Sequence, residues 1–113
     1  MAKLWIDDIR PAPEGYIWCK STLNALHTIF KYRFNEITEI NLDHDAGEYA
    51  KEGGDFIEIL KELERLCHSP QALKQAFWKT KCQEYTFVLH SANPVGVENM
   101  RRIIQKNGWT EAR

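Results

Sequence analysis

The sequence has few of the features that mark secreted, membrane-embedded or polyanion-binding proteins. Its three cysteines are odd in number and show no CxxC spacing, which argues against a disulfide framework and a structural zinc site. No window approaches the roughly 20 apolar residues of a membrane span, so no membrane partner is expected. The formal net charge is -1, so strong nonspecific binding to nucleic acid is not expected either.

What is present fits an ordinary globular protein. A chain of 113 residues with 43% hydrophobic residues can hold one core, so we predict a single domain over residues 1–113. The apolar run at residues 4–6 stops at Asp7 and Asp8 and is shorter than the core of a secretory signal peptide. We therefore expect a cytoplasmic protein with reduced thiols.

Short apolar runs alternate with amphipathic patterns along the chain. We predict buried strands at residues 3–6, 16–19, 37–42 and 84–89. Helices are predicted to begin near Ser21 or Thr22, at Asp55 and at Pro94, with an additional helix over residues 72–80. Such alternation is typical of an open parallel sheet, so we predict a three-layer α/β fold with about four strands and helices on both faces.

Short polar side chains gather where three of these strands end. They are Asp7 and Asp8 after the first strand, Asp43, His44 and Asp45 after the third, and His90, Ser91 and Asn93 after the fourth. In an open parallel sheet, ligands bind beyond the carboxyl ends of the strands. We therefore expect these side chains to share one edge of the sheet.

The four aspartates of this set predict a cation site. Carboxylates at that density repel one another, by about 1 kcal/mol per pair at 4 Å even in water, unless a proton or a cation neutralises them. A hard divalent ion, Mg2+ first and Mn2+ or Zn2+ as alternatives, suits such ligands. The competing interpretation is that each aspartate caps a helix or turn and faces water.

The other polar residues suggest phosphate chemistry. Two imidazoles, His44 and His90, would divide proton transfer between them, or would serve as zinc ligands together with a carboxylate. The guanidinium of Arg10 suits a phosphate, or alternatively a salt bridge to a neighbouring aspartate. Ser91 and Asn93 precede the last helix and would donate to a phosphate oxygen.

This pattern resembles the receiver domain of two-component signalling. Receivers carry an acidic pair after the first strand, which would match Asp7 and Asp8, and a phospho-accepting aspartate after the third, which would match Asp43. Ser91 followed by Ala92 would match the family's Ser or Thr and Ala after the fourth strand. The departures are a connection at residues 9–15 too short and proline-rich for the usual first helix, no predicted fifth strand, and no counterpart of the family's lysine.

A closer resemblance covers nearly the whole chain. The motifs LWIDDIRP at residues 4–11, LDHD at residues 42–45 and HSANPVG at residues 90–96 resemble the cyclic-phosphate processing receiver domain family. The resemblance implies a receiver- or flavodoxin-like fold and a reaction on cyclic phosphates of nucleotides or RNA ends. Residues 67–84 resemble an insertion.

We therefore predict a metal-dependent phosphodiesterase. The predicted metal ligands are Asp7, Asp8, Asp43 and Asp45; the predicted catalytic residues are Arg10, His44, His90, Ser91 and Asn93; and the predicted substrate-binding residues are Arg10, Ser91, Asn93 and Gly96. Two alternatives stay open at this point. One is a divergent receiver phosphorylated on Asp43, and the other is a catalytically silent module that binds a nucleotide or a protein.

Overall fold

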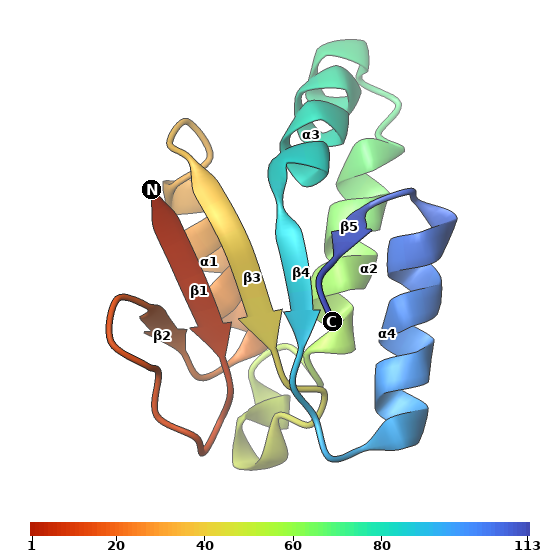
Figure 1. The fold of residues 1–113 in the computed structure, drawn as a ribbon. Helices are drawn as coiled ribbons and strands as arrows, with labels where there is room; N and C mark the ends of the chain where they lie inside the picture. The colour runs from red at the N-terminus through yellow and green to blue at the C-terminus, as the bar shows by residue number, and fades with distance from the viewer.

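A parallel sheet of five strands organises the computed structural model, which describes all of residues 1–113 (Figure 1). The strands lie in the order β2-β1-β3-β4-β5. Their bounds are β1 Ala2–Ile6, β2 Ile17–Cys19, β3 Ile37–Leu42, β4 Thr86–Leu89 and β5 Thr110–Glu111. The parallel α/β fold of receiver type that the sequence predicts is therefore confirmed.

Four α-helices and one 3-10 helix connect the strands. Their bounds are α1 Thr22–Lys31, η1 Gly47–Lys51, α2 Ile57–Cys67, α3 Ala72–Glu84 and α4 Pro94–Lys106. Local signals define two of the helix starts: Ser21 caps α1 by accepting from the Asn24 N–H, and Asn93 caps α4 by accepting from the Gly96 N–H. The additional helix predicted after residue 71 is present as α3 and packs on α2.

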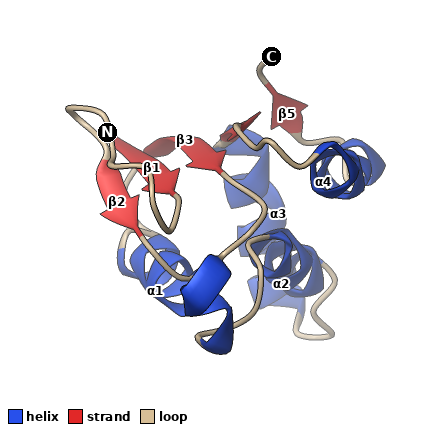
Figure 2. Ribbon diagram, turned by 90° about the horizontal axis from the view of Figure 1, so that it is seen from below, coloured by secondary structure: helices blue, strands red, loops and turns tan.

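All the helices lie on one face of the sheet, so the prediction of helices on both faces is wrong. Figure 2 shows α1, α2, α3 and α4 on the same side of the strands, and α2 contacts each of the other three helices. Right-handed crossovers that run in one direction along a sheet place their helices on one face. Only the step from β1 to β2 runs the opposite way, and its connection contains Pro11 and Pro13 and forms no helix. The molecule therefore has two layers.

The sheet also has a fifth strand, which the sequence analysis does not predict. Thr110 and Glu111 pair with Thr86 and Phe87 of β4. The ring of Trp109 stacks on Phe87, with centroids 5.4 Å apart, and joins the core. A strand of two residues is too short to show an alternation of apolar and polar residues in the sequence. Its position is fixed by the packing of Trp109 instead. The absence of a helix between β1 and β2 is as predicted.

The core lies between the sheet and the helix layer. Alternate residues of the central strands face the helices and are fully buried, among them Leu4, Ile6, Ile40, Leu42 and Phe87. This packing fixes the register of β1, β3 and β4, and with it the place where each strand ends. No helix of the structure has the length and apolarity that crossing a bilayer requires.

Candidate functional site

The carboxyl ends of β1, β3 and β4 surround a cavity of about 380 Å³. Most of the residues that the strand-end pattern predicts contribute to its wall. The lining residues are Asp8, Ile9, Arg10, Asp43, Asp45, Gly47, Ser91, Ala92 and Asn93. The parallel sheet therefore brings these predicted residues together, while Asp7, His44, His90 and Gly96 are not among the lining residues.

Three carboxylates form the acidic part of the site. Oxygen atoms of Asp7, Asp8 and Asp43 all lie within 4.8 Å of one another. Asp7 is buried, with 1% of its surface exposed, whereas Asp8 and Asp43 are half-buried and line the cavity. The backbone N–H of His44 donates to Asp43 Oδ1 at 2.8 Å and holds that carboxylate at the end of β3.

Asp7 is held as a charged group inside the protein. Its Oδ1 accepts from the backbone N–H groups of Ile9 and Arg10, each at 2.9 Å, and its Oδ2 faces His90. Burial on its own would raise the pKa of Asp7, but these hydrogen bonds and the nearby His90 outweigh it and lower the pKa below its usual value. The carboxylate therefore anchors the turn that follows β1.

Asp8 has the opposite electrostatic environment. Burial raises the pKa of Asp8, and the negative charges of Asp7, Asp43 and Asp45 raise it further. Gly47, with φ +55°, passes so close to Asp8 that a Cβ at this position would clash with Asp8 Oδ2. The Asp8 carboxylate is thus crowded into a region of negative charge.

Three residues hold the ring of His90 in place. Asn41 Nδ2 donates to Glu39 at 3.1 Å, which turns Asn41 Oδ1 toward His90 Nδ1. His90 Nε2 lies 2.8 Å from Asp7 Oδ2, and the ring stacks on Trp5 with centroids 3.9 Å apart. Both ring nitrogens therefore face oxygen atoms.

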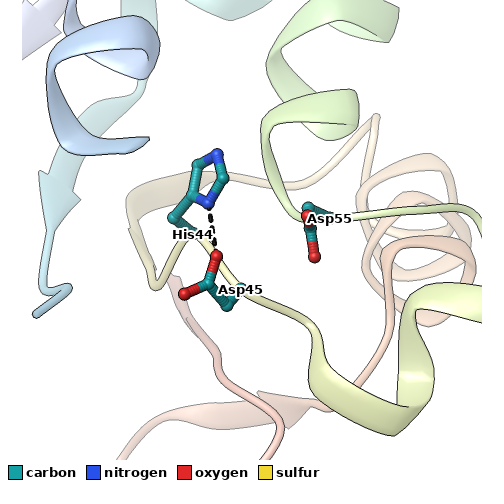
Figure 3. A group of neighbouring side chains, drawn as sticks. All are labelled: His44, Asp45 and Asp55. Carbon is teal, nitrogen blue, oxygen red and sulfur yellow. Dashed lines mark hydrogen bonds and ion pairs between the residues drawn. The ribbon is translucent and has the colours of Figure 1, made fainter. Parts of the chain in front are cut away.

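A second group of possible ligands lies beside the first. His44, Asp45 and Asp55 offer atoms that lie within 4.8 Å of one another. Figure 3 shows the Asp45 carboxylate against one ring nitrogen of His44, with Asp55 on the segment that leads into α2. His44 Nδ1 lies 2.7 Å from Asp45 Oδ1, and this hydrogen bond lowers the pKa of Asp45. The second ring nitrogen of His44 points away from Asp45 (Figure 3).

The segment between β4 and α4 forms another part of the cavity wall. Asn93 Nδ2 donates to Asp45 at 3.2 Å, and Ser91 Oγ accepts from the Asn93 N–H at 3.1 Å. The N–H of Gly96 donates to Asn93 Oδ1, so it is already used within the helix cap. Gly96 instead makes room for an imidazole, because a Cβ at this position would clash with the ring of His44.

Arg10 lies on the rim of the cavity. Its side chain is exposed, and Nη1 lies 3.4 Å from the carbonyl oxygen of His90. The ion pairs of the structure do not include one between Arg10 and an aspartate, so its charge faces the cavity without a carboxylate partner. An anion beside Asp8 and Asp43 would therefore meet a guanidinium there.

Sequence reasoning missed three residues that shape this site. The sequence predicts a helix start at Asp55, but α2 begins at Ile57, and the Asp55 carboxylate accepts from the Ala46 N–H and lies near His44. Asn41 and Trp5 lie within strands and fix His90 through a hydrogen bond and a stacked ring. Strand alternation places Trp5 and Asn41 on one face, which is the signal that could have found them.

The fold and the site together define a receiver-like domain with an acidic cavity at the carboxyl edge of its sheet. A sequence model of the cyclic-phosphate processing receiver domain matches residues 2–106 of the chain. The chain therefore belongs to the family of cyclic-phosphate processing receiver domains. The comparisons with curated proteins and with solved structures gave no match.

Proposed function

We propose that this domain is a metal-dependent phosphoesterase that opens cyclic phosphates of nucleotides or RNA ends. One observation carries the proposal: the carboxylates of Asp8 and Asp43 share a cavity of about 380 Å³ with the guanidinium of Arg10. The acidic side suits a cation and the basic side suits an anion, which is the pairing that a metal-bound phosphate needs.

The donor set fits a hard divalent ion. Asp8 and Asp43 would hold it from the cavity wall, with Asp7 behind them and Asp45 beside them. Burial raises the pKa of Asp8, and the negative charges of Asp7, Asp43 and Asp45 raise it further; a cation would neutralise that charge. Oxygen donors of this kind favour Mg2+ or Mn2+, whereas Zn2+ would draw on His44. When bound, such an ion polarises a phosphoryl oxygen and lowers the pKa of a water molecule.

The remaining cavity residues would bind the phosphate. Arg10 would pair with its non-bridging oxygens, and the amide of Asn93 and the hydroxyl of Ser91 would donate to them. Ser91 Oγ accepts a backbone hydrogen bond, which leaves its own O–H free to donate to a ligand. These donors would stabilise the negative charge that develops on the phosphoryl oxygens during attack by water.

The two histidines would have different roles. His90 uses both ring nitrogens on Asn41 and Asp7, so we assign it the positioning of the Asp7 carboxylate. His44 bonds Asp45 through Nδ1 and retains its second nitrogen for proton transfer. We therefore assign general acid–base catalysis to His44, with Asp45 orienting the ring.

The decisive test is hydrolysis of 2′,3′-cyclic nucleotides with and without Mg2+. We expect turnover that requires the metal, and a loss on the order of 100-fold or more in Asp43→Asn and in His44→Ala. Glu14→Gln, an exposed residue of the β1–β2 connection, serves as the matched control and should keep full activity. Full activity in both site variants would overturn the proposal.

The same preparation separates the two alternatives. A divergent receiver would gain the mass of one phosphoryl group from a small phosphodonor and Mg2+, and Asp43→Asn would not. A silent binding module would bind nucleotide without turnover, and its melting temperature would not respond to metal. Either outcome, together with an absence of hydrolysis, would replace the phosphoesterase proposal.

A further inference from the structure

The face of the sheet opposite the helices carries a cluster of aromatic rings. Trp5 and Trp18 are register partners on β1 and β2, so their side chains lie on the same face. The ring of Tyr16 meets Trp5 edge-on, with centroids 6.0 Å apart. No helix covers this face, and all three rings are half-buried. We call Trp5, Tyr16 and Trp18 the aromatic face.

Positive charge accompanies these rings. Lys3 Nζ lies 5.6 Å from the centroid of Tyr16, and Lys20 Nζ lies 4.4 Å from the centroid of Trp18. Glu39 places a carboxylate among the rings, but it accepts hydrogen bonds from the Tyr16 hydroxyl at 2.6 Å and from Asn41. The aromatic face thus combines flat apolar rings with flexible cations, although the whole chain has a net charge of only -1.

The aromatic face adjoins the proposed phosphate site. Trp5 Nε1 donates to the backbone oxygen of Arg10 at 2.9 Å, and the Trp5 ring stacks on His90. Trp18 Nε1 donates to the backbone oxygen of Asp7 at 2.8 Å. The turn that follows β1 therefore has the cavity on one side and the aromatic face on the other.

We propose that the aromatic face binds the bases of single-stranded RNA whose cyclic-phosphate end occupies the cavity. This inference rests on the proposed function and extends that function, because base binding by the aromatic face would make an RNA end a better substrate than a mononucleotide. Open sheet faces with aromatic side chains bind single-stranded RNA by stacking, and lysines beside them contact the backbone phosphates. The cations above the rings favour a polyanionic occupant over an apolar protein surface.

The test compares a 2′,3′-cyclic mononucleotide with a tetraribonucleotide that ends in the same group. We expect the KM of the tetranucleotide to be about tenfold lower, the gain that one or two stacked bases provide. Tyr16→Leu and Lys3→Gln should remove most of that difference while kcat on the mononucleotide is unchanged. Tyr16→Phe keeps the aromatic ring and should retain the difference in KM. Phe34→Leu, which removes an exposed aromatic residue before β3, is the matched control.

Direct binding provides a second measurement that needs no turnover. A fluorescently labelled tetranucleotide with a 3′-phosphate should bind about tenfold more weakly to Tyr16→Leu than to the parent protein, with Tyr16→Phe unaffected. If RNA binds in this way but no cyclic phosphate is hydrolysed, the aromatic face stands and the proposed function fails.

Three results would overturn the inference. The first is hydrolysis with equal KM values for the two substrates, which would leave the proposed function intact. The second is equal RNA binding by Tyr16→Leu and the parent protein. The third is self-association of the parent protein that Tyr16→Leu abolishes, because that would identify the aromatic face as a contact between copies of this chain.

Discussion

His90 Nε2 lies 2.8 Å from Asp7 Oδ2, beneath the ring of Trp5 that stacks on the imidazole. The substitution His90→Phe preserves a flat ring beside Trp5 but removes both ring nitrogens. We expect it to lower the free energy of unfolding by about 1–3 kcal/mol, because a buried carboxylate loses a partner. Urea unfolding followed by circular dichroism measures this change.

The pH dependence of that effect follows from Asp7. Folding lowers the pKa of the Asp7 carboxyl below its ordinary value of 3.8, so the ionised carboxylate stabilises the folded protein at pH values above 3.8. This contribution to stability is lost as the pH falls through the lowered pKa of the folded state. The difference in the free energy of unfolding between the parent and His90→Phe should therefore have its full size at pH 7 and become smaller below about pH 4. A constant difference across this range would contradict the role of His90 as the partner of Asp7.

Asp8→Asn should stabilise the protein in the absence of metal. The pKa of Asp8 is raised by burial and by three neighbouring carboxylates, so its charge costs stability above that raised pKa. Removing one close repulsion contributes about 1 kcal/mol, or about 4 °C in melting temperature for a domain of this size. The gain should vanish as the pH falls below about 3.8, where the carboxyl is protonated in the folded and unfolded states.

Added Mg2+ should reverse the ranking of these two proteins. The parent is expected to gain melting temperature on metal addition, and Asp8→Asn is expected to gain little, because it lacks one of the proposed ligands. Thermal scans in EDTA and in Mg2+ measure the melting temperatures of both proteins without and with the metal. If Asp8→Asn melts below the parent in EDTA, mutual repulsion of the carboxylates is the wrong description of this cluster.

Gly96→Ala should disturb His44 without touching the cavity wall. The new Cβ would clash with the imidazole, so we expect a loss of about 1–3 kcal/mol in stability together with reduced hydrolysis. In a His44→Ala background there is no imidazole for the new Cβ to clash with, so adding Gly96→Ala should lower stability much less. Val95→Ala, an exposed neighbour in the first turn of α4, is the control. Equal costs in the two backgrounds would show that the ring is not what Gly96 accommodates.

Tyr85→Phe should leave the fold unchanged or make it more stable. The hydroxyl of Tyr85 is buried and has no hydrogen-bond partner, and burial raises the pKa of this phenol. Removing an unsatisfied hydroxyl should add about 1 kcal/mol to the free energy of unfolding. Tyr16→Phe, which loses a hydrogen bond to Glu39, should change stability in the opposite direction. A destabilised Tyr85→Phe protein would indicate a partner for that hydroxyl.

Much of the sheet could be predicted because its strands are short apolar runs that end abruptly. Residues 37–42 form β3 as expected, and the aspartates and His44 follow it at the carboxyl edge. The helix starts predicted near Ser21 or Thr22 and at Pro94 are also confirmed, because each start depends on local sequence.

The features that could not be predicted depend on residues distant in the sequence. Leu23 and Phe34 fit an apolar helical stripe yet are 58% and 77% exposed. Leu23 lies on the outer side of α1, which buries Ala25 and Ile29, and Phe34 lies beyond the end of α1 at Lys31. The pairing of β5 and the approach of Asp55 to His44 each need a partner from another element. The one-sided helix layer follows from the order in which the strands join the sheet, which local pattern does not encode.

The connection between β1 and β2 has a consequence for the energetics of ligand binding. Pro11 and Pro13 restrict its backbone, and Asp7 and Trp18 tie its start to the sheet through hydrogen bonds. If Arg10 binds a phosphate as proposed, a segment restrained before the ligand arrives would lose little conformational entropy on binding. A helix between β1 and β2 would cover Trp5 and Tyr16. The short β1–β2 connection therefore both restrains the cavity rim at Arg10 and leaves this face of the sheet without a helix.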